Sequence, residues 1–90
     1  MVDIDVLKYG KNLQLDLHGL SRDEAICELI YSVENVDSDI KAILIVHGFH
    51  KGTVLSKLVR REFSHKFIYK IIKVDASRTL YLIDKGNYCG

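Results

Sequence analysis

Two histidine-glycine pairs, His18-Gly19 and His47-Gly48, stand where a strand pattern gives way to a helix pattern. Asp16 precedes His18 by two residues, and residues two apart in a strand share a face, so their side chains project together. Histidine exchanges protons near neutral pH, and a neighbouring carboxylate orients the ring and favours its charged form. These residue types suit general acid–base chemistry. The plain alternative is a pair of solvent-facing residues on an edge strand.

The second pair opens a glycine-rich loop, HGFHKGT, over residues 47–53. Gly48 and Gly52 permit positive φ or a close backbone approach, and Thr53 can cap the following helix. The loop also carries two basic side chains, His50 and Lys51. Backbone N–H groups and Lys51 could together cradle a phosphate, whereas the alternative is a flexible turn. The GxxxxGK[ST] pattern of a Walker loop is missing, so the loop does not indicate nucleotide hydrolysis.

The first turn lies between a strand and a capped helix. Leu13, Leu15 and Leu17 alternate with polar residues, which predicts a strand with one buried face. Ser21 followed by Glu24 forms a capping box and begins a helix, which ends at the polar stretch 35–39. The apolar residues expected to face inward from this helix are Ile26, Leu29, Ile30 and Val33.

The second turn follows an apolar run, Ala42–Val46, with the length of a strand buried on both faces. A second helix is predicted from near Thr53, and two more strands, over 67–74 and 79–83, are joined by a short hairpin. The inward residues expected from that helix are Val54, Leu55, Leu58 and Val59. In a βαβαββ order, strands joined through helices are parallel neighbours, so both turns should meet at one sheet edge. Open α/β sheets bind ligands there, and helix N-termini favour phosphate.

Charge is distributed unevenly along the chain. Residues 1–40 contain three basic and nine acidic residues, a net charge of −6, whereas residues 41–73 contain eight basic and one acidic, a net charge of +7. Such asymmetry indicates polyanion binding, although the two halves could instead neutralise each other across the folded surface. Lys57, Arg60 and Arg61 share one side of the second helix, as a nucleic-acid backbone surface or a solvated face. Tyr69 and Tyr81 could stack on bases or pack in the sheet.

Length and composition predict a single α/β domain, since the chain has 90 residues, 48% of them hydrophobic, and no proline. We expect an N-terminal arm or short strand over residues 1–12, the domain over 13–85 and a tail over 86–90. No apolar run approaches the ~20 residues that cross a membrane, and the N-terminus lacks a secretory signal. Cys27, expected on the core side of the first helix, and Cys89 are distantly spaced. They indicate reduced thiols in a cytoplasmic protein.

Taken together, the two turns resemble those of the small MutS-related (Smr) domain family. That family pairs an L-D-L-H-G-L strand end with a later H-G-x-G-x-G-x-L-R loop. This sequence has LDLHGLSRDEA and then ILIVHGFHKGTVL, and the resemblance covers about Leu13 to Phe63. In the second motif His47 and Gly48 match the family pattern, and Gly52 occupies the position of its last loop glycine. The middle glycine is His50, one residue is added before the leucine, and Ser56 replaces the arginine.

The resemblance implies a two-layer α/β fold with a mixed four-stranded sheet, like the C-terminal domain of bacterial translation initiation factor three. It also implies a nucleic-acid-binding or nicking domain, because family members attached to larger proteins are endonucleases acting on DNA or on messenger RNA at stalled ribosomes. The aspartate and histidine of the first motif are held responsible for cleavage, and here they are Asp16 and His18.

We therefore hypothesise an endonuclease, a hydrolase of phosphodiester bonds in RNA more than in DNA. His18, oriented by Asp16, would be the general base, and His47 or His50 would protonate the leaving oxygen or bind the phosphate. The expected nucleic-acid contacts are Gly19, Gly48, His50, Lys51, Gly52, Thr53, Lys57, Arg60 and Arg61. No metal site is predicted, and a single Mg²⁺ is the one cofactor left open. The alternatives are a non-catalytic nucleic-acid- or ribosome-binding module and a small interaction domain with a basic partner. The sequence leaves the oligomeric state open.

Overall fold

The first strand and the first helix form where alternation and capping predict them. In the computed structural model, which describes residues 11–48 and 54–85, β1 spans Asn12–Asp16 and α1 spans Arg22–Asn35. Ser21 Oγ accepts the backbone N–H of Glu24, and the Glu24 carboxylate accepts the backbone N–H of Ser21. Two N–H groups that the helix itself cannot pair are thereby satisfied, which confirms the capping box.

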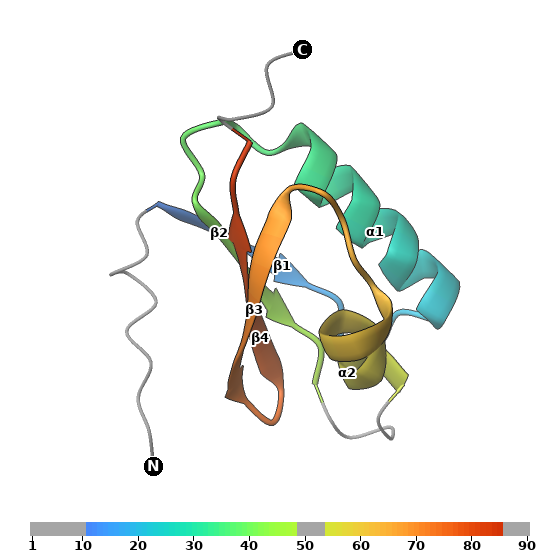
Figure 1. Cartoon of the computed structure of the whole chain (residues 1–90). Coiled ribbons are helices and arrows are strands. Elements are labelled where there is room, and N and C mark those ends of the chain that lie inside the picture. Colours follow the sequence, from blue (N-terminus) through green and yellow to red (C-terminus); the bar gives the residue numbers. More distant parts are fainter. Residues whose placement is uncertain (1–10, 49–53, 86–90) are drawn as a thin grey trace.

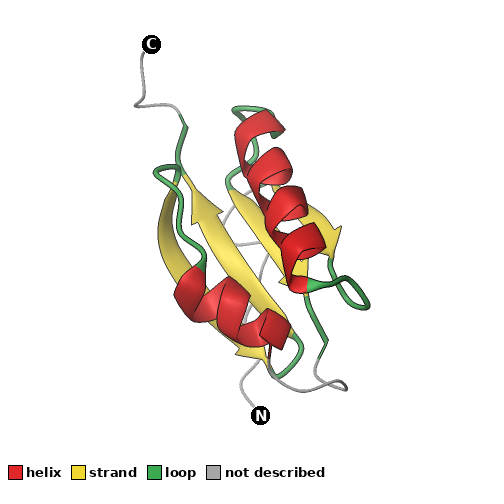
Figure 2. Ribbon diagram, turned by 90° about the vertical axis from the view of Figure 1, so that its right-hand side faces the viewer, coloured by secondary structure: helices red, strands yellow, loops and turns green. Residues whose placement is uncertain are grey.

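The remaining elements complete a mixed four-stranded sheet. They are β2 (Ala42–Val46), α2 (Val54–Lys57), the π-helical turn η2 (Leu58–Glu62), β3 (Ile68–Asp75) and β4 (Arg78–Ile83). The strands lie in the order β1-β2-β4-β3, with β1 and β2 parallel and the other two pairs antiparallel (Figure 1). Both helices cover the same face of the sheet (Figure 2). The predicted two-layer α/β architecture and the βαβαββ order are confirmed.

The main core lies between the helices and the sheet. Leu29 and Val33 of α1 pack there with Ile43 and Ile45 of β2, and all four are fully buried. A second buried cluster, of Ala42, Leu44, Leu80 and Leu82, lies on the opposite face of β2 and β4. Strand β2 is therefore buried on both faces, as its continuous apolar run predicts. None of the helices formed by the described residues is both long and apolar enough to cross a membrane.

Tyr81 is a core residue rather than a base-stacking one. Its ring is fully buried and stacks on that of Phe63 at 6.2 Å, and its hydroxyl donates to the backbone carbonyl of Val59 at 2.5 Å. Burial raises the pKa of this phenol above its usual range. The hydroxyl thus ties β4 to η2, and Tyr69, which is 65% exposed, is the one of the two tyrosines open to a ligand.

Three predictions about the helix faces are wrong. Cys27 is exposed and Ile30 is 39% exposed, because α1 presents to the sheet a narrow stripe at four-residue spacing, Ala25, Leu29 and Val33. Val54, expected to face inward, is 55% exposed. The second helix changes pitch at η2, where the Phe63 N–H donates to Leu58 O, five residues back. A π turn holds more residues than an α turn, so faces assigned from a 3.6-residue spacing do not continue through it.

We predict that Tyr81→Phe destabilises the domain by about 1–3 kcal/mol, because it leaves the buried carbonyl of Val59 without its donor. Urea denaturation followed by circular dichroism measures the change. Tyr69→Phe, which removes the same atom from an exposed ring, is the control and should unfold at the parent midpoint. Equal midpoints for both variants would contradict an anchoring role for the Tyr81 hydroxyl.

Candidate active site

The parallel pairing of β1 with β2 brings the two histidine-glycine turns together at one edge of the sheet. Asp16 lies opposite Val46, and the Leu17 N–H donates to Val46 O at 2.7 Å. Continued by two residues, this register sets His18 beside Gly48. A Cβ added to Gly48 would lie 3.5 Å from the Cβ of His18, which agrees with that placement. The predicted meeting of the turns is confirmed, with an offset of one residue between the histidines.

Both turns depend on a glycine in the left-handed region of φ. Gly19 has φ 84° and Gly48 has φ 72°, values that other residues adopt only with strain. Gly19 lies in the turn that follows β1, and Gly48 lies just after the end of β2. The turn at Gly19 leads into the capped N-terminus of α1, and the turn at Gly48 leads into the loop 49–53, which lies outside the described residues.

Asp16 and His18 form a hydrogen-bonded pair on the exposed side of this edge. Asp16 Oδ1 lies 2.5 Å from His18 Nδ1 and also accepts the backbone N–H of His18 at 3.0 Å. The two bonds fix both the ring and its backbone, and they assign the Nδ1 proton to the bond with the carboxylate. The Nε2 atom is left to face a ligand. With 70% of the His18 side chain and 51% of the Asp16 side chain exposed, the pair is open to a large substrate.

The electrostatics of the pair keep Asp16 ionised. The hydrogen bond from the His18 side chain, followed by that from the His18 backbone, lowers the pKa of Asp16. Because Asp16 Oδ1 holds the Nδ1–H of His18, a proton taken from a substrate would be accepted at Nε2. This arrangement suits a general base that becomes an imidazolium during the reaction.

His47 occupies a different environment, although it precedes a glycine in the same way. It follows Ile43 and Ile45 in the alternation of β2 and so falls on the helix-covered face, where it is 3% exposed. Its Nδ1 lies 3.0 Å from Gly48 O and its Nε2 lies 3.0 Å from Thr79 Oγ1. Burial, first, and the charge of Arg60 lower the pKa of His47. With both nitrogens bonded inside the protein, His47 positions the second turn, and the prediction that it protonates a leaving group is corrected.

Arg60 likewise faces inward. Its Nε donates to Thr79 Oγ1 at 2.7 Å, and its Nη2 donates to the backbone carbonyls of Asp75 and Arg78. Since Thr79 Oγ1 accepts from Arg60, its own hydrogen is available to His47 Nε2, which accounts for a neutral His47 with its proton on Nδ1. The prediction that Arg60 shares an exposed basic side with Lys57 and Arg61 is wrong, because η2 turns Arg60 toward the β3–β4 hairpin. Lys57 and Arg61 remain exposed.

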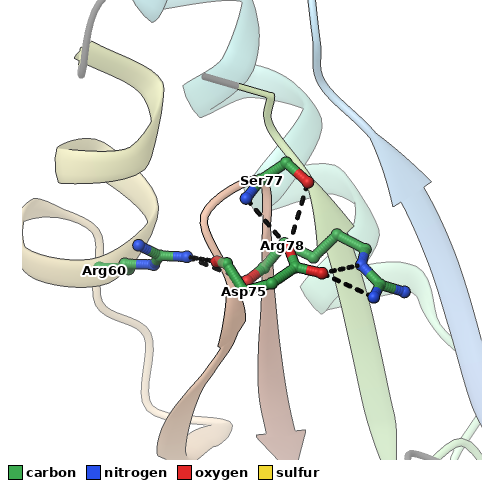
Figure 3. A network of polar contacts seen from close by, with 4 residues as sticks. All are labelled: Arg60, Asp75, Ser77 and Arg78. Carbon is green, nitrogen blue, oxygen red and sulfur yellow. Dashed lines mark hydrogen bonds and ion pairs between the residues drawn. The ribbon is translucent and has the colours of Figure 1, made fainter. Parts of the chain in front are cut away.

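The β3–β4 hairpin contributes residues that the sequence did not single out. Ser77 O accepts the backbone N–H groups of His47 and Gly48, so the Gly48 amide is already bonded inside the protein rather than facing a phosphate. Asp75 Oδ1 accepts from the backbone N–H and hydroxyl of Ser77, and Asp75 Oδ2 accepts from Nε and Nη2 of Arg78 (Figure 3). The sequence DASR, residues 75–78, predicts only a hairpin turn. Its three charged or hydroxyl side chains within four residues are the feature that could have marked it.

Four of the predicted nucleic-acid contacts are not placed by the structure. His50, Lys51, Gly52 and Thr53 lie outside the described residues. His65 is placed away from this edge, where its Nε2 lies 3.1 Å from Glu34 Oε2. Within residues 11–48 and 54–85, no group of three or more histidine, cysteine, aspartate or glutamate side chains is arranged to hold a metal ion.

We predict that the buried, neutral His47 makes the domain less stable at pH 5 than at pH 7.5. Its folded pKa lies below the unfolded value, so its contribution is fully present above the unfolded pKa and is lost as pH falls toward the folded pKa. The groups that face its ring are Arg60 and Asp75, and neither changes charge in this range. The slope of unfolding free energy against pH, at most about 1.4 kcal/mol per pH unit for one proton, should be smaller in His47→Gln. His65→Gln is the control, and an equal reduction in both variants would contradict the assignment.

The comparisons with known proteins identify the family to which this geometry belongs. The Smr domain family model matches residues 15–78. No curated protein and no solved structure matches the chain significantly. The matched segment begins within β1 and ends at the first residue of β4, so it contains both turns, the Asp16–His18 pair and the hairpin turn that holds them in register. Because the match covers most of the 90 residues, the chain belongs to the Smr domain family of nucleic-acid-binding, nuclease-type modules.

Proposed function

We propose that this domain is an endonuclease that cleaves phosphodiester bonds, in RNA rather than DNA, with the Asp16–His18 pair as its general base. The observation that carries the proposal is the 2.5 Å contact of Asp16 Oδ1 with His18 Nδ1 on an exposed sheet edge. Family membership supports nucleic acid as the substrate class. The net charge of +7 over residues 41–73 supports a polyanionic substrate.

The proposed reaction uses the 2′-hydroxyl of the RNA as nucleophile. His18 Nε2 takes the proton of the 2′-OH, the 2′ oxygen forms a bond to phosphorus, and the bond from phosphorus to the 5′ oxygen breaks. The 5′ oxygen leaves with a proton from water or from the second loop, where His50 and Lys51 lie outside the described residues. The products are a 2′,3′-cyclic phosphate and a 5′-hydroxyl. Asp16 keeps the ring oriented and stabilises the imidazolium.

RNA is the favoured substrate because its own 2′-hydroxyl is the nucleophile, so one accessible general base is sufficient for cleavage. DNA cleavage needs an activated water as well as a stabilised leaving group, and the neighbouring His47 has both ring nitrogens bonded inside the protein. An internal nucleophile also brings the benefit of proximity without a second binding site. A single Mg²⁺ ion remains part of the proposal only as an additional stabiliser of phosphate charge.

We predict that His18→Ala lowers the single-turnover rate on a labelled structured RNA by about 10²–10⁴-fold, because it removes the general base. Asp16→Asn should lower the rate by less, since the ring remains but loses its orienting charge. His65→Ala is the matched control and should cleave at the parent rate. Reactions with Mg²⁺ and with EDTA decide the role of the metal, and a 2′-deoxy substitution at the cleaved nucleotide should block the reaction. Parent-like cleavage by His18→Ala would overturn the proposal.

A second candidate function is a non-catalytic module that binds RNA or the ribosome. It is favoured by the burial of His47, which leaves His18 as the one histidine of the described residues exposed at this edge. RNA that shifts in a gel but is not cut by the parent protein would support this candidate. Removal of the exposed Lys57 and Arg61 should then flatten the salt dependence of binding, while His18→Ala should have little effect. Either function is proposed for the cytoplasm, where the exposed thiol of Cys27 would stay reduced.

A further inference from the structure

A row of paired residues crosses the sheet at the edge that holds Asp16 and His18. Asp16 of β1 pairs with Val46 of β2, Val46 pairs with Arg78 of β4, and Arg78 pairs with Asp75 of β3. Directly paired residues project from the same face of a sheet. The row therefore places Arg78 on the same face as Asp16. With two strand spacings between them, their backbones are about 10 Å apart.

This face is the one opposite the helices. Alternation along β4 puts Thr79 and Tyr81 toward the helices, and Arg78 and Leu80 away from them. Figure 3 shows the consequence, with Arg60 and Arg78 reaching the hairpin turn from opposite sides. Among the described residues, Arg60 donates to Thr79 and to two backbone carbonyls, so its role is to hold the hairpin against η2. Arg78 projects from the face away from the helices.

Asp75 holds Arg78 in a fixed direction without using all of its donors. Nε and Nη2 of Arg78 donate to the single oxygen Oδ2 of Asp75, at 2.9 and 2.6 Å. A guanidinium carries five N–H groups, so three are left that Asp75 does not accept. The Arg78 side chain is 42% exposed. The hydrogen bond from Arg78 lowers the pKa of Asp75 to about 2, so this ion pair persists throughout the neutral range.

The second carboxylate oxygen of Asp75 is bonded within the hairpin turn. This oxygen, Oδ1, accepts from the backbone N–H and the hydroxyl of Ser77. Both carboxylate oxygens are thus bonded to donors of the same turn, which weakens their repulsion of an approaching anion. An arginine held by a carboxylate in this way presents a planar, pre-oriented set of donors, the geometry that suits bidentate contact with a phosphate.

We infer that Arg78 binds a backbone phosphate of the substrate strand, next to the phosphate attacked at His18, and so sets the position of the strand on the sheet edge. The inference rests on the proposed function, because Asp16 and His18 mark where the scissile phosphate lies. Val46, half-buried in the same row, forms the floor between the two positions. The strand would cross β2 from the Asp16–His18 pair to Arg78.

The test measures binding separately from cleavage. In a His18→Ala background, Arg78→Gln should raise the Kd of a labelled single-stranded RNA by about tenfold or more and reduce the slope of log Kd against log salt by about one. Arg78→Lys should restore the slope but only part of the affinity, because an ammonium cannot make the bidentate contact. Lys11→Gln is the matched control, since Lys11 is also an exposed, ion-paired cation (Nζ 3.0 Å from Asp39 Oδ2) at the other end of β1. Its change in Kd should be less than twofold.

The outcomes separate this inference from the proposed function. Unchanged Kd and salt slope in Arg78→Gln, or a change no larger than in Lys11→Gln, would overturn the role of Arg78. Parent-like cleavage by His18→Ala would overturn the proposed chemistry, while the effect of Arg78 on binding would still be measured. A thermal melt of each variant establishes folding. If Arg78→Gln is not folded, Arg78→Lys decides, and parent affinity and slope in that variant would overturn the bidentate contact.

Discussion

The parallel ladder between β1 and β2 sets the position of every residue in the proposed site. Its last pair, Asp16 with Val46, places His18 beside Gly48. His47 is offset from His18 by one residue and lies under the helices. Among the strands of the described residues, β1 pairs with β2 alone, so its register depends on Leu17 in the core and on the backbone bond from Leu17 to Val46. A slip by one residue would turn Asp16 and His18 to the helix-covered face and take the proposed general base away from solvent.

The β3–β4 hairpin fixes the same edge from the other side. Because β4 lies antiparallel next to β2, its first residues arrive where β2 ends, and Ser77 O accepts the N–H groups of His47 and Gly48. Two polar chains then diverge from the hairpin. On the helix side, Arg60, Thr79 and His47 form a buried chain of hydrogen bonds, and no buried side-chain polar atom of the described residues lacks a partner. On the other face, Asp75 holds Arg78 in a partly exposed ion pair. Buried polar groups stabilise only when fully paired, so the inner chain gives rigidity and the outer pair keeps donors for a ligand.

Local patterns in the sequence were sufficient for much of this arrangement. The capping box at Ser21, the alternation before His18 and the apolar run of β2 each depend on neighbouring residues, and the structure confirms them. The prediction that His47 acts on the substrate is wrong because His47 lies on the helix-covered face of β2. The two-residue alternation that begins with Ile43 and Ile45 puts His47 on this buried face. The inward turn of Arg60 could not be predicted, because the π turn at η2 has no spacing of its own in the sequence and follows from packing against the hairpin. The sequence predicts a turn at residues 75–78, whereas the ion pair of Asp75 with Arg78 across that turn emerges only from the structure.

The distribution of charge over the sheet indicates the path that the proposed nucleic-acid strand takes across it. Among the described residues, most acidic side chains of the first half lie on α1 and the loop after it, whereas β3, the strand at the far edge, carries two exposed lysines, Lys70 and Lys73. Lys70 pairs with Leu82 and therefore lies on the same face as Arg78, the one away from the helices. A polyanion attracted toward this side and repelled from α1 would leave the Asp16–His18 pair across β2 and β4 rather than along the helix. The same path passes over Arg78. The residue that we propose to bind the neighbouring phosphate therefore comes from the hairpin turn and not from either histidine-glycine motif.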